Sequence, residues 1–262
     1  MKAIILAAGM GTRLGKYTKN LPKCMLNFAG KTLIERQVNI LKKCGVKDII
    51  VVKGYKAEKI QILGTKSYLN KDYANTNMVE TLFRAEKEMN KPILVCYADI
   101  IYEKRVLKKI MENKSDIAVT VDADYWEYWQ ARMKNPKEDM ESLVIDSTKK
   151  IIELGDTHCS KNQAQVRYLG LIKFSKKGVK ALRKIYYENK KKYFHKNKPW
   201  LRSKSFKKAY MTCMLQALIN AGYRVDPIVV KRGWLEFDTV EDYDKYNLWL
   251  RDDSIKRFIA ID

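Results

Sequence analysis

The first 26 residues, Met1 to Leu26, constrain the fold more than any other stretch of this chain. They begin with the apolar run Lys2 to Leu6, which predicts a buried strand, and continue into a glycine-rich turn from Ala7 to Leu14. Glycine accepts backbone conformations that other residues avoid and leaves room for a close ligand. Because a strand that ends in such a turn directs backbone N–H groups at an anion, we expect a phosphate-binding loop here.

Two cations accompany the turn. Arg13 offers a planar fork of donors that suits phosphate oxygens, and Lys23 adds a mobile point charge a few residues later. The turn matches neither the dinucleotide-binding pattern G-x-G-x-x-G nor a P-loop, which requires G-K-[ST]. We expect Arg13 and Lys23 to be catalytic. The expected nucleotide contacts at the strand end and turn are Leu6, Ala7, Ala8, Gly9, Met10, Gly11 and Thr12.

The next elements set the fold class. Thr32 and Glu35 form a capping-box pattern before a helix that reaches about Cys44, and an apolar strand follows at 48–52. A strand, a helix and a second strand in this order predict a right-handed crossover and a parallel sheet. We therefore expect a single α/β domain over residues 1–262, with a Rossmann-like, mostly parallel mixed sheet flanked by helices. Residues from about 123 to 205 should partly form a substrate-covering subregion, beginning with an inserted mobile loop to about 141.

Carboxylates at predicted strand ends indicate a metal site. Asp99 ends the apolar run that starts at Pro92, and Glu236 and Asp238 lie two residues apart near the end of another strand, so their side chains share a face. Such oxygen ligands suit Mg²⁺ beside a phosphate turn. We favour Asp99 and Asp238 as the ligands, with Glu236 as the alternative to Asp238.

Several of these segments resemble a known family. The stretch from Leu6 to Leu14, with Pro22-Lys23, resembles the sugar-nucleotide-type nucleotidyltransferase superfamily, whose fold is similar to GT-A. The Asn-rich segment 75–82 looks most like the small-alcohol cytidylyltransferases that act on phosphocholine, 2-aminoethylphosphonate or phosphoglutamine. The segment 234–243 is similar to the superfamily's closing acidic segment. Two departures are Ala98, where the family usually has glycine, and Val240, where it has proline.

The resemblance implies a cytoplasmic cytidylyltransferase. It would join the CMP moiety of CTP to a small phosphorylated or phosphonate amino compound with release of pyrophosphate, use Mg²⁺, and serve surface-polysaccharide (capsule) biosynthesis. The base contacts that it implies are Asn75, Asn77, Met78, Val79 and Glu80. Two alternatives stay open: a hexose-1-phosphate nucleotidyltransferase that uses another NTP, and a non-catalytic nucleotide- or RNA-binding protein.

A cluster of aromatic and acidic residues suggests where the acceptor binds. Segment 122–129 supplies aromatic faces and carboxylates, which suit a cationic amine better than a neutral hexose. Packing of these rings and anchoring of the loop is an equally good explanation. The expected acceptor contacts are Asp122, Asp124, Tyr125, Trp126, Tyr128 and Trp129, together with Tyr168 and Trp200.

Composition bounds the possible partners. The chain carries 52 Lys and Arg against 30 Asp and Glu, a formal charge of +22. This excess fits either a nucleic-acid or membrane surface, or a lysine-rich surface with a cationic phosphate pocket. Because the lysine runs alternate with apolar residues at helical spacing, we expect no specific nucleic acid and no membrane partner. Monomer and homodimer both stay open.

The cysteines and the first residues indicate the cellular compartment in which the protein is expected. The five cysteines are scattered without a C-x-x-C pair, so neither a zinc site nor a disulfide framework is predicted. The chain opens on a predicted buried strand rather than a secretion signal, and no run of about 18 apolar residues predicts a membrane span. We expect a cytoplasmic protein.

Overall fold

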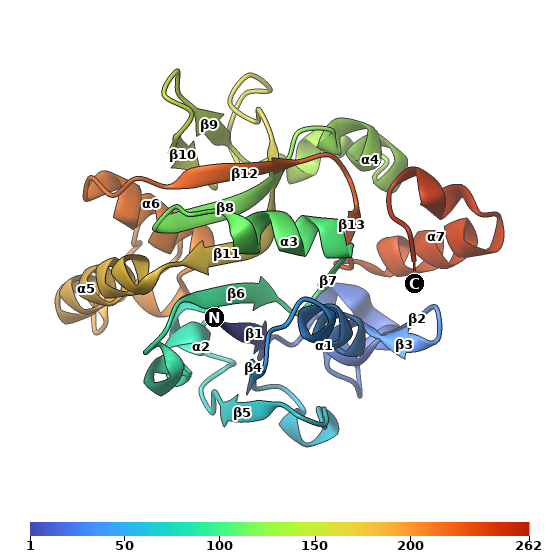
Figure 1. The fold of residues 1–262 in the computed structure, drawn as a ribbon, viewed down its shortest axis with the longest axis horizontal. Coiled ribbons are helices and arrows are strands. Elements are labelled where there is room, and N and C mark those ends of the chain that lie inside the picture. Colours follow the sequence, from blue (N-terminus) through green and yellow to red (C-terminus); the bar gives the residue numbers. More distant parts are fainter. Residues whose placement is uncertain (262) are drawn as a thin grey trace.

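A seven-stranded sheet forms the centre of the computed structural model, which describes residues 1–261 (Figure 1). Its strand order is β12-β8-β11-β6-β1-β4-β5. Strand β11 runs antiparallel to β6 and β8, and the other neighbouring strands are parallel. The strands are β1 (Lys2–Ala7), β4 (Asp48–Lys53), β5 (Lys66–Leu69), β6 (Ile93–Tyr97), β8 (Ile117–Asp122), β11 (Arg167–Phe174) and β12 (Asp226–Val230). The predicted single α/β domain with a mostly parallel mixed sheet is confirmed.

Smaller strand pairs and helices surround this sheet. The pairs are β2 (Asn27–Phe28) with β3 (Lys31–Thr32), β7 (Ile100–Tyr102) with β13 (Trp234–Glu236), and β9 (Leu143–Ile145) with β10 (Ile151–Leu154). The helices are α1 (Leu33–Lys43), α2 (Met78–Arg84), α3 (Lys104–Glu112), α4 (Tyr125–Arg132), α5 (Lys176–Tyr193), α6 (Met211–Asn220) and α7 (Val240–Arg251). No helix among residues 1–261 combines the length and the apolar character needed to cross a membrane.

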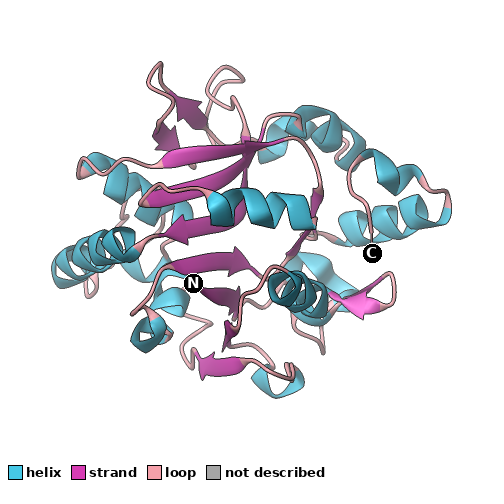
Figure 2. Ribbon diagram, in the orientation of Figure 1, coloured by secondary structure: helices cyan, strands magenta, loops and turns pink. Residues whose placement is uncertain are grey.

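Helices cover both faces of the sheet because its central strands are apolar on both sides (Figure 2). Ile5 of β1 belongs to the hydrophobic cluster formed with α1 and α3, which lie in front of the sheet in Figure 1. Its neighbour Ile4 points the other way, into the cluster formed with α2, α5 and α6. Burial of one such side chain stabilises the fold by about 1.5–3 kcal/mol. Side chains that alternate along β1 therefore pack into the hydrophobic clusters on the two faces of the sheet.

Capping boxes begin two of these helices, and the sequence predicted the first of them. The hydroxyl of Thr32 accepts a hydrogen bond from the N–H of Glu35 at α1, and Thr239 and Asp242 form the same reciprocal pair at α7. Such caps satisfy N–H groups that have no partner within the helix. The second box lies directly after Asp238, so it also fixes the backbone beside a predicted site residue.

The segment after β8 differs from its prediction. Residues 123–141 were expected to form a mobile loop, but they contain helix α4 and a 3₁₀ turn at Pro136–Asp139. The helix has a weak apolar stripe, because aromatic side chains occur around much of its circumference. Tertiary packing stabilises it instead, since Tyr128 and Trp129 are buried in the core formed with β13 and α7. An antiparallel pair of strands, β9 and β10, follows this segment.

Gly170 lies at an irregularity in the pairing of β11. Its φ is +83°, and the pairing of β11 with β8 shifts register between Tyr168 and Ile172. A Cβ at position 170 would lie 2.6 Å from the ring of Tyr97. Only glycine meets both conditions without strain.

We expect Gly170→Ala to destabilise the protein by about 2–5 kcal/mol, because it adds left-handed strain and overpacking. Gly222→Ala is the matched control: the φ of Gly222 is +85°, but a Cβ there would meet no atom within 4 Å. It should lose only about 1–2 kcal/mol. Urea unfolding of both variants measures the difference, and equal losses would show that the contact with Tyr97 is unimportant.

Candidate active site

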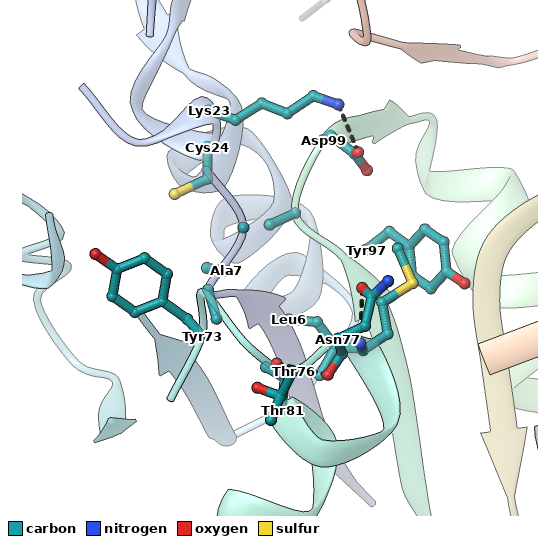
Figure 3. Close-up of a pocket in the computed structure, with 14 residues that line it drawn as sticks. Leu6, Ala7, Lys23, Cys24, Tyr73, Thr76, Asn77, Thr81, Tyr97 and Asp99 are labelled. Carbon is teal, nitrogen blue, oxygen red and sulfur yellow. Dashed lines mark hydrogen bonds and ion pairs between the residues drawn. The ribbon is translucent and has the colours of Figure 1, made fainter. Parts of the chain in front are cut away.

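Charged side chains from three distant segments meet at the carboxyl edge of the sheet. The Nζ atom of Lys23 lies 2.8 Å from Asp99 Oδ2, a contact that Figure 3 shows, and 2.9 Å from Asp238 Oδ1. Arg13 Nη1 lies 2.7 Å from the second oxygen of Asp238. Asp99 follows β6 and Asp238 follows β13. The structure thus brings together the four charged residues that we favoured from the sequence.

Burial and charge set the protonation of this cluster. Burial lowers the pKa of Lys23, but the carboxylates of Asp99 and Asp238 more than offset this and raise it, so the ammonium stays charged. Burial raises the pKa of Asp99, and Lys23 opposes that rise without cancelling it. Among the described residues, Asp99 Oδ1 is buried and has no hydrogen-bond partner. One carboxylate oxygen is therefore available for a further positive ligand.

The carboxylates of this cluster fit a Mg²⁺ ion whose remaining ligands come from water and substrate. Within residues 1–261, no group of three or more His, Cys, Asp or Glu is arranged as a metal cage. Mg²⁺ usually takes only one or two carboxylates and fills its remaining positions with water and phosphate oxygens. Asp99 and Asp238 would supply those two carboxylates.

Close packing fixes the glycine-rich turn. Gly11 has a φ of +63°, and a Cβ on it would approach Lys23 Cβ to 3.0 Å. Behind the turn, a Cβ on Gly54 would lie 2.6 Å from the carbonyl oxygen of Ala8. The N–H of Tyr55 donates to that same oxygen at 3.1 Å. The sequence analysis missed this support from the end of β4, although a glycine after a predicted strand is a signal for close approach.

A cavity of about 110 Å³ lies between the end of β1 and the start of α2 (Figure 3). Several predicted nucleotide contacts line it, namely Leu6, Ala7, Ala8, Gly9, Asn77 and Met78, together with Lys23 and Asp99. Residues that the sequence analysis missed also line it: Cys24, Tyr73, Thr76, Thr81, Tyr97 and Ala98. Thr76 precedes Asn77, and Thr81 follows it by four residues, about one helical turn. Their position at the cavity was not predicted from the sequence. Met10 and Thr12 lie in the exposed part of the turn.

Three of the predicted base contacts, Asn75, Val79 and Glu80, are not among the residues that line this cavity. The amide of exposed Asn75 donates to Asp72 at 2.9 Å. Val79 is fully buried in the core, and Glu80 is 3% exposed and accepts a hydrogen bond from Tyr186 at 2.8 Å. Successive residues of a helix point in different directions, so only part of the segment 75–80 can face the cavity of about 110 Å³.

A second cavity, of about 690 Å³, adjoins the first and shares Met78, Tyr97 and Asp99 with it. Both signs of charge occur in its lining, which includes Arg13, Asp139, Glu141, Arg167, Arg202 and Asp238. Tyr168 also lines it, and its hydroxyl is buried without a hydrogen-bond partner among the described residues. Of the predicted acceptor residues, Tyr168 therefore lies at this cavity.

The other predicted acceptor residues lie elsewhere. Five of them are at most 6% exposed and pack in the core, namely Asp122, Tyr125, Tyr128, Trp129 and Trp200. The carboxylate of Asp122 accepts from Trp234 Nε1 at 2.8 Å and from two backbone N–H groups. Trp126 is half-buried beneath Lys161, and Asp124 precedes α4. The predicted acceptor residues of segment 122–129 line neither of these two cavities, and their aromatic rings pack on one another.

Glu236 has a different partner from Asp238. Its carboxylate lies 2.8 Å from Nη1 of the fully buried Arg132. Burial alone would raise the pKa of Glu236, but Arg132 and Arg167 more than offset this and lower it to about 2. Glu236 is held by arginines, whereas Asp238 contacts Lys23 directly.

Comparison with known proteins agrees with this geometry. A sequence model of the MobA-like NTP transferase domain matches residues 3–191. The chain belongs to this family. One relative of this MobA-like transferase, the CTP:phosphoglutamine cytidylyltransferase of Campylobacter jejuni, is 34% identical over 93% of this chain and 98% of its own length. The choline-phosphate cytidylyltransferase of Streptococcus pneumoniae is 42% identical over 34% of this chain and 41% of its own length. The resemblance found in the sequence, to nucleotidyltransferases and most of all to small-alcohol cytidylyltransferases, is confirmed.

Solved structures show the same fold. The inositol-1-phosphate CTP transferase from T. maritima aligns with a TM-score of 0.72 and 20% identity, over 99% of this chain and 98% of that chain. The CTP:phosphocholine cytidylyltransferase from S. pneumoniae aligns with a TM-score of 0.66 and 23% identity, over 95% of this chain and 98% of that chain. At these identities the likeness concerns the fold.

We expect Lys23→Ala to lower kcat by about a hundredfold or more, because the variant would lose the positive charge that we expect to face the reacting phosphates. Steady-state pyrophosphate release measures this effect. Lys16→Ala is the matched control, since Lys16 lies in the same loop with its side chain 66% exposed. Turnover near that of the parent in Lys23→Ala would remove Lys23 from the mechanism.

Proposed function

We propose that this MobA-like transferase joins the CMP moiety of CTP to a small phosphorylated or phosphonate amino compound and releases pyrophosphate. The observation that carries the proposal is the position of Lys23, which binds Asp99 and Asp238 where the two cavities meet. The cytosine base and the amino acceptor are taken from the relatives that this chain resembles over most of its length. A role in surface-polysaccharide biosynthesis stays a prediction.

The chemistry is an in-line displacement at phosphorus. An oxygen of the acceptor phosphate or phosphonate attacks the α-phosphorus of CTP, and the bond from that phosphorus to the bridging oxygen of pyrophosphate breaks. No covalent enzyme intermediate is required, so positioning and charge stabilisation supply the rate enhancement. Lys23 would donate to the α-phosphate and the incoming group. Arg13 and the N–H groups of the turn 8–12 would hold the β- and γ-phosphates.

Asp99 and Asp238 would hold Mg²⁺ beside the triphosphate. When bound, the ion neutralises charge on the phosphate oxygens and on the leaving pyrophosphate. The two carboxylates come from separate elements, and Lys23 lies between them. The lysine therefore keeps them close together before nucleotide arrives, because it offsets their mutual repulsion.

The larger cavity suits an acceptor that carries an amino group. Asp139 lies in its lining but binds Arg167, with 3.1 Å between Asp139 Oδ2 and Arg167 Nη2. Glu141 lines the same cavity and is half-buried, and Tyr168 offers an aromatic face and a hydroxyl without a partner among residues 1–261. We place the acceptor's amino group near Glu141 and Tyr168, where each cation–π contact adds about 0.5–2 kcal/mol.

A substrate panel tests the function. CTP, UTP, GTP and ATP would each be combined with phosphoglutamine, phosphocholine, 2-aminoethylphosphonate and glucose-1-phosphate, and pyrophosphate release would be followed. We expect turnover with CTP and at least one amino acceptor, and none with glucose-1-phosphate. A preference for glucose-1-phosphate would favour the hexose-1-phosphate alternative. Absence of turnover with any pair would favour a non-catalytic nucleotide-binding protein.

Removal of one metal-binding oxygen tests the role of Mg²⁺. Asp99→Asn keeps the size of the side chain and replaces an anionic oxygen by an amide, so we expect turnover to be abolished or to require far more Mg²⁺. Titration of activity with Mg²⁺ measures this. Asp146→Asn is a suitable control, because Asp146 lies at the exposed turn between β9 and β10. Full activity of the parent in excess EDTA would contradict the metal requirement.

A further inference from the structure

One buried side chain of α4, Arg132, contacts carboxylates on either side of Asp238 in the sequence. Its guanidinium binds two of them at once. Nε and Nη2 donate to the two oxygens of Asp242 at 2.8 and 2.7 Å, and Nη1 donates to Glu236 at 2.8 Å. A planar guanidinium fits this two-sided contact, and a lysine ammonium does not.

Asp242 extends this contact to the backbone of Asp238. Its Oδ2 accepts hydrogen bonds from the N–H of Asp238 at 3.0 Å and from the N–H of Thr239 at 2.9 Å. The same oxygen accepts from Arg132, so one atom joins the arginine to the start of α7. The side chain of Asp238 then contacts Lys23 and Arg13. The chain of contacts from Arg132 to Lys23 is continuous and largely buried.

Hydrogen bonds also fix the backbone of the two residues before Asp238. The N–H of Glu236 donates to the hydroxyl of Tyr128 at 3.0 Å, and the hydroxyl of Tyr246 donates to the carbonyl of Glu236 at 3.0 Å. The N–H of Phe237 donates to the carbonyl of Asp99 at 2.9 Å. The segment that carries Asp238 is thus fixed to α4, to α7 and to the other predicted metal-binding residue.

We propose that Arg132 is a positioning residue for Asp238 and acts through Asp242; this inference rests on the proposed function. Without the arginine, Glu236 would lose its ion-pair partner, and Asp242 would be a buried carboxylate without a paired cation and would move towards water. The N–H groups of Asp238 and Thr239 would then lose their fixed acceptor, and the Asp238 carboxylate would leave its place opposite Asp99. Residues that orient metal ligands typically contribute about 10–100-fold to metal affinity.

Mn²⁺ binding tests the inference without catalysis. Arg132→Lys keeps the positive charge but cannot bind Asp242 through two nitrogens and Glu236 through a third. We expect its Kd for Mn²⁺ in the presence of CTP, without acceptor, to rise about tenfold or more, as measured by electron paramagnetic resonance of free Mn²⁺. The Mg²⁺ concentration for half-maximal turnover should rise in parallel. A Kd and a Mg²⁺ requirement equal to those of the parent would overturn the inference.

Glu88→Gln is the matched control for lost stability. Glu88 is also a buried carboxylate held by a cation, with 2.7 Å between Glu88 Oε2 and Lys2 Nζ, but it lies by the first residue of β1, at the opposite end of the strand from the phosphate turn. This variant should unfold more easily than the parent and bind Mn²⁺ as the parent does. An equal loss of Mn²⁺ affinity in Glu88→Gln and Arg132→Lys would mean that general destabilisation explains the effect, and would overturn the inference.

Asp242→Asn tests the same chain of contacts without a change at Arg132, so it can be used if Arg132→Lys does not fold. The amide keeps the size of the side chain but cannot accept every hydrogen bond that the carboxylate accepts, so the Kd for Mn²⁺ should rise by a similar factor. Where both variants fold, the double variant should show no further loss, because the two residues act in one chain of contacts. Parent-like Mn²⁺ binding by Asp242→Asn, or additive losses, would contradict the route through Asp242. A parent that binds no Mn²⁺ with CTP would overturn the proposed function as well.

Discussion

The ion pairs of Lys23 with Asp99 and Asp238 organise the active site. Two carboxylates held close together at the edge of a core repel each other and are poorly hydrated, so the fold needs a cation between them. Lys23 provides it from the loop after β1, at 2.8 and 2.9 Å. One ammonium group thereby ties the N-terminal loop to the end of β6 and to the segment before α7. The same charge lies where a triphosphate would enter.

The surrounding elements hold these charges in place. Helix α7 packs on the glycine-rich loop, since the rings of Tyr17 and Tyr243 lie 4.5 Å apart between centroids. Helix α4 holds the opposite side through Arg132 and through the hydroxyl of Tyr128. The aromatic cluster that suggested an acceptor pocket therefore has a structural role: it anchors a helix behind the carboxylates. Its acidic member Asp122 is satisfied by Trp234 rather than open to a ligand.

In the proposed function, the two cavities would hold the two substrates on different parts of the fold. The smaller cavity lies at the ends of the parallel strands β1 and β6, in the regular part of the sheet. The larger cavity is built on β11, the antiparallel strand, and on segments that connect the outer elements. Tyr97 lines both cavities, and its ring lies 5.5 Å between centroids from that of Tyr168, which lines the larger one.

The sequence by itself determined the parallel core, the glycine-rich turn and the identities of Lys23, Asp99 and Asp238. These features follow from local patterns, because strand periodicity, glycine and charge at a strand end act within a few residues. The sequence could not determine which side chains of segments 75–80 and 122–129 face a ligand. That choice depends on helix orientation and on partners far away in the chain, such as Tyr186 for Glu80 and Trp234 for Asp122. Only the tertiary structure brought these partners together and decided that burial, rather than ligand contact, stabilises those side chains.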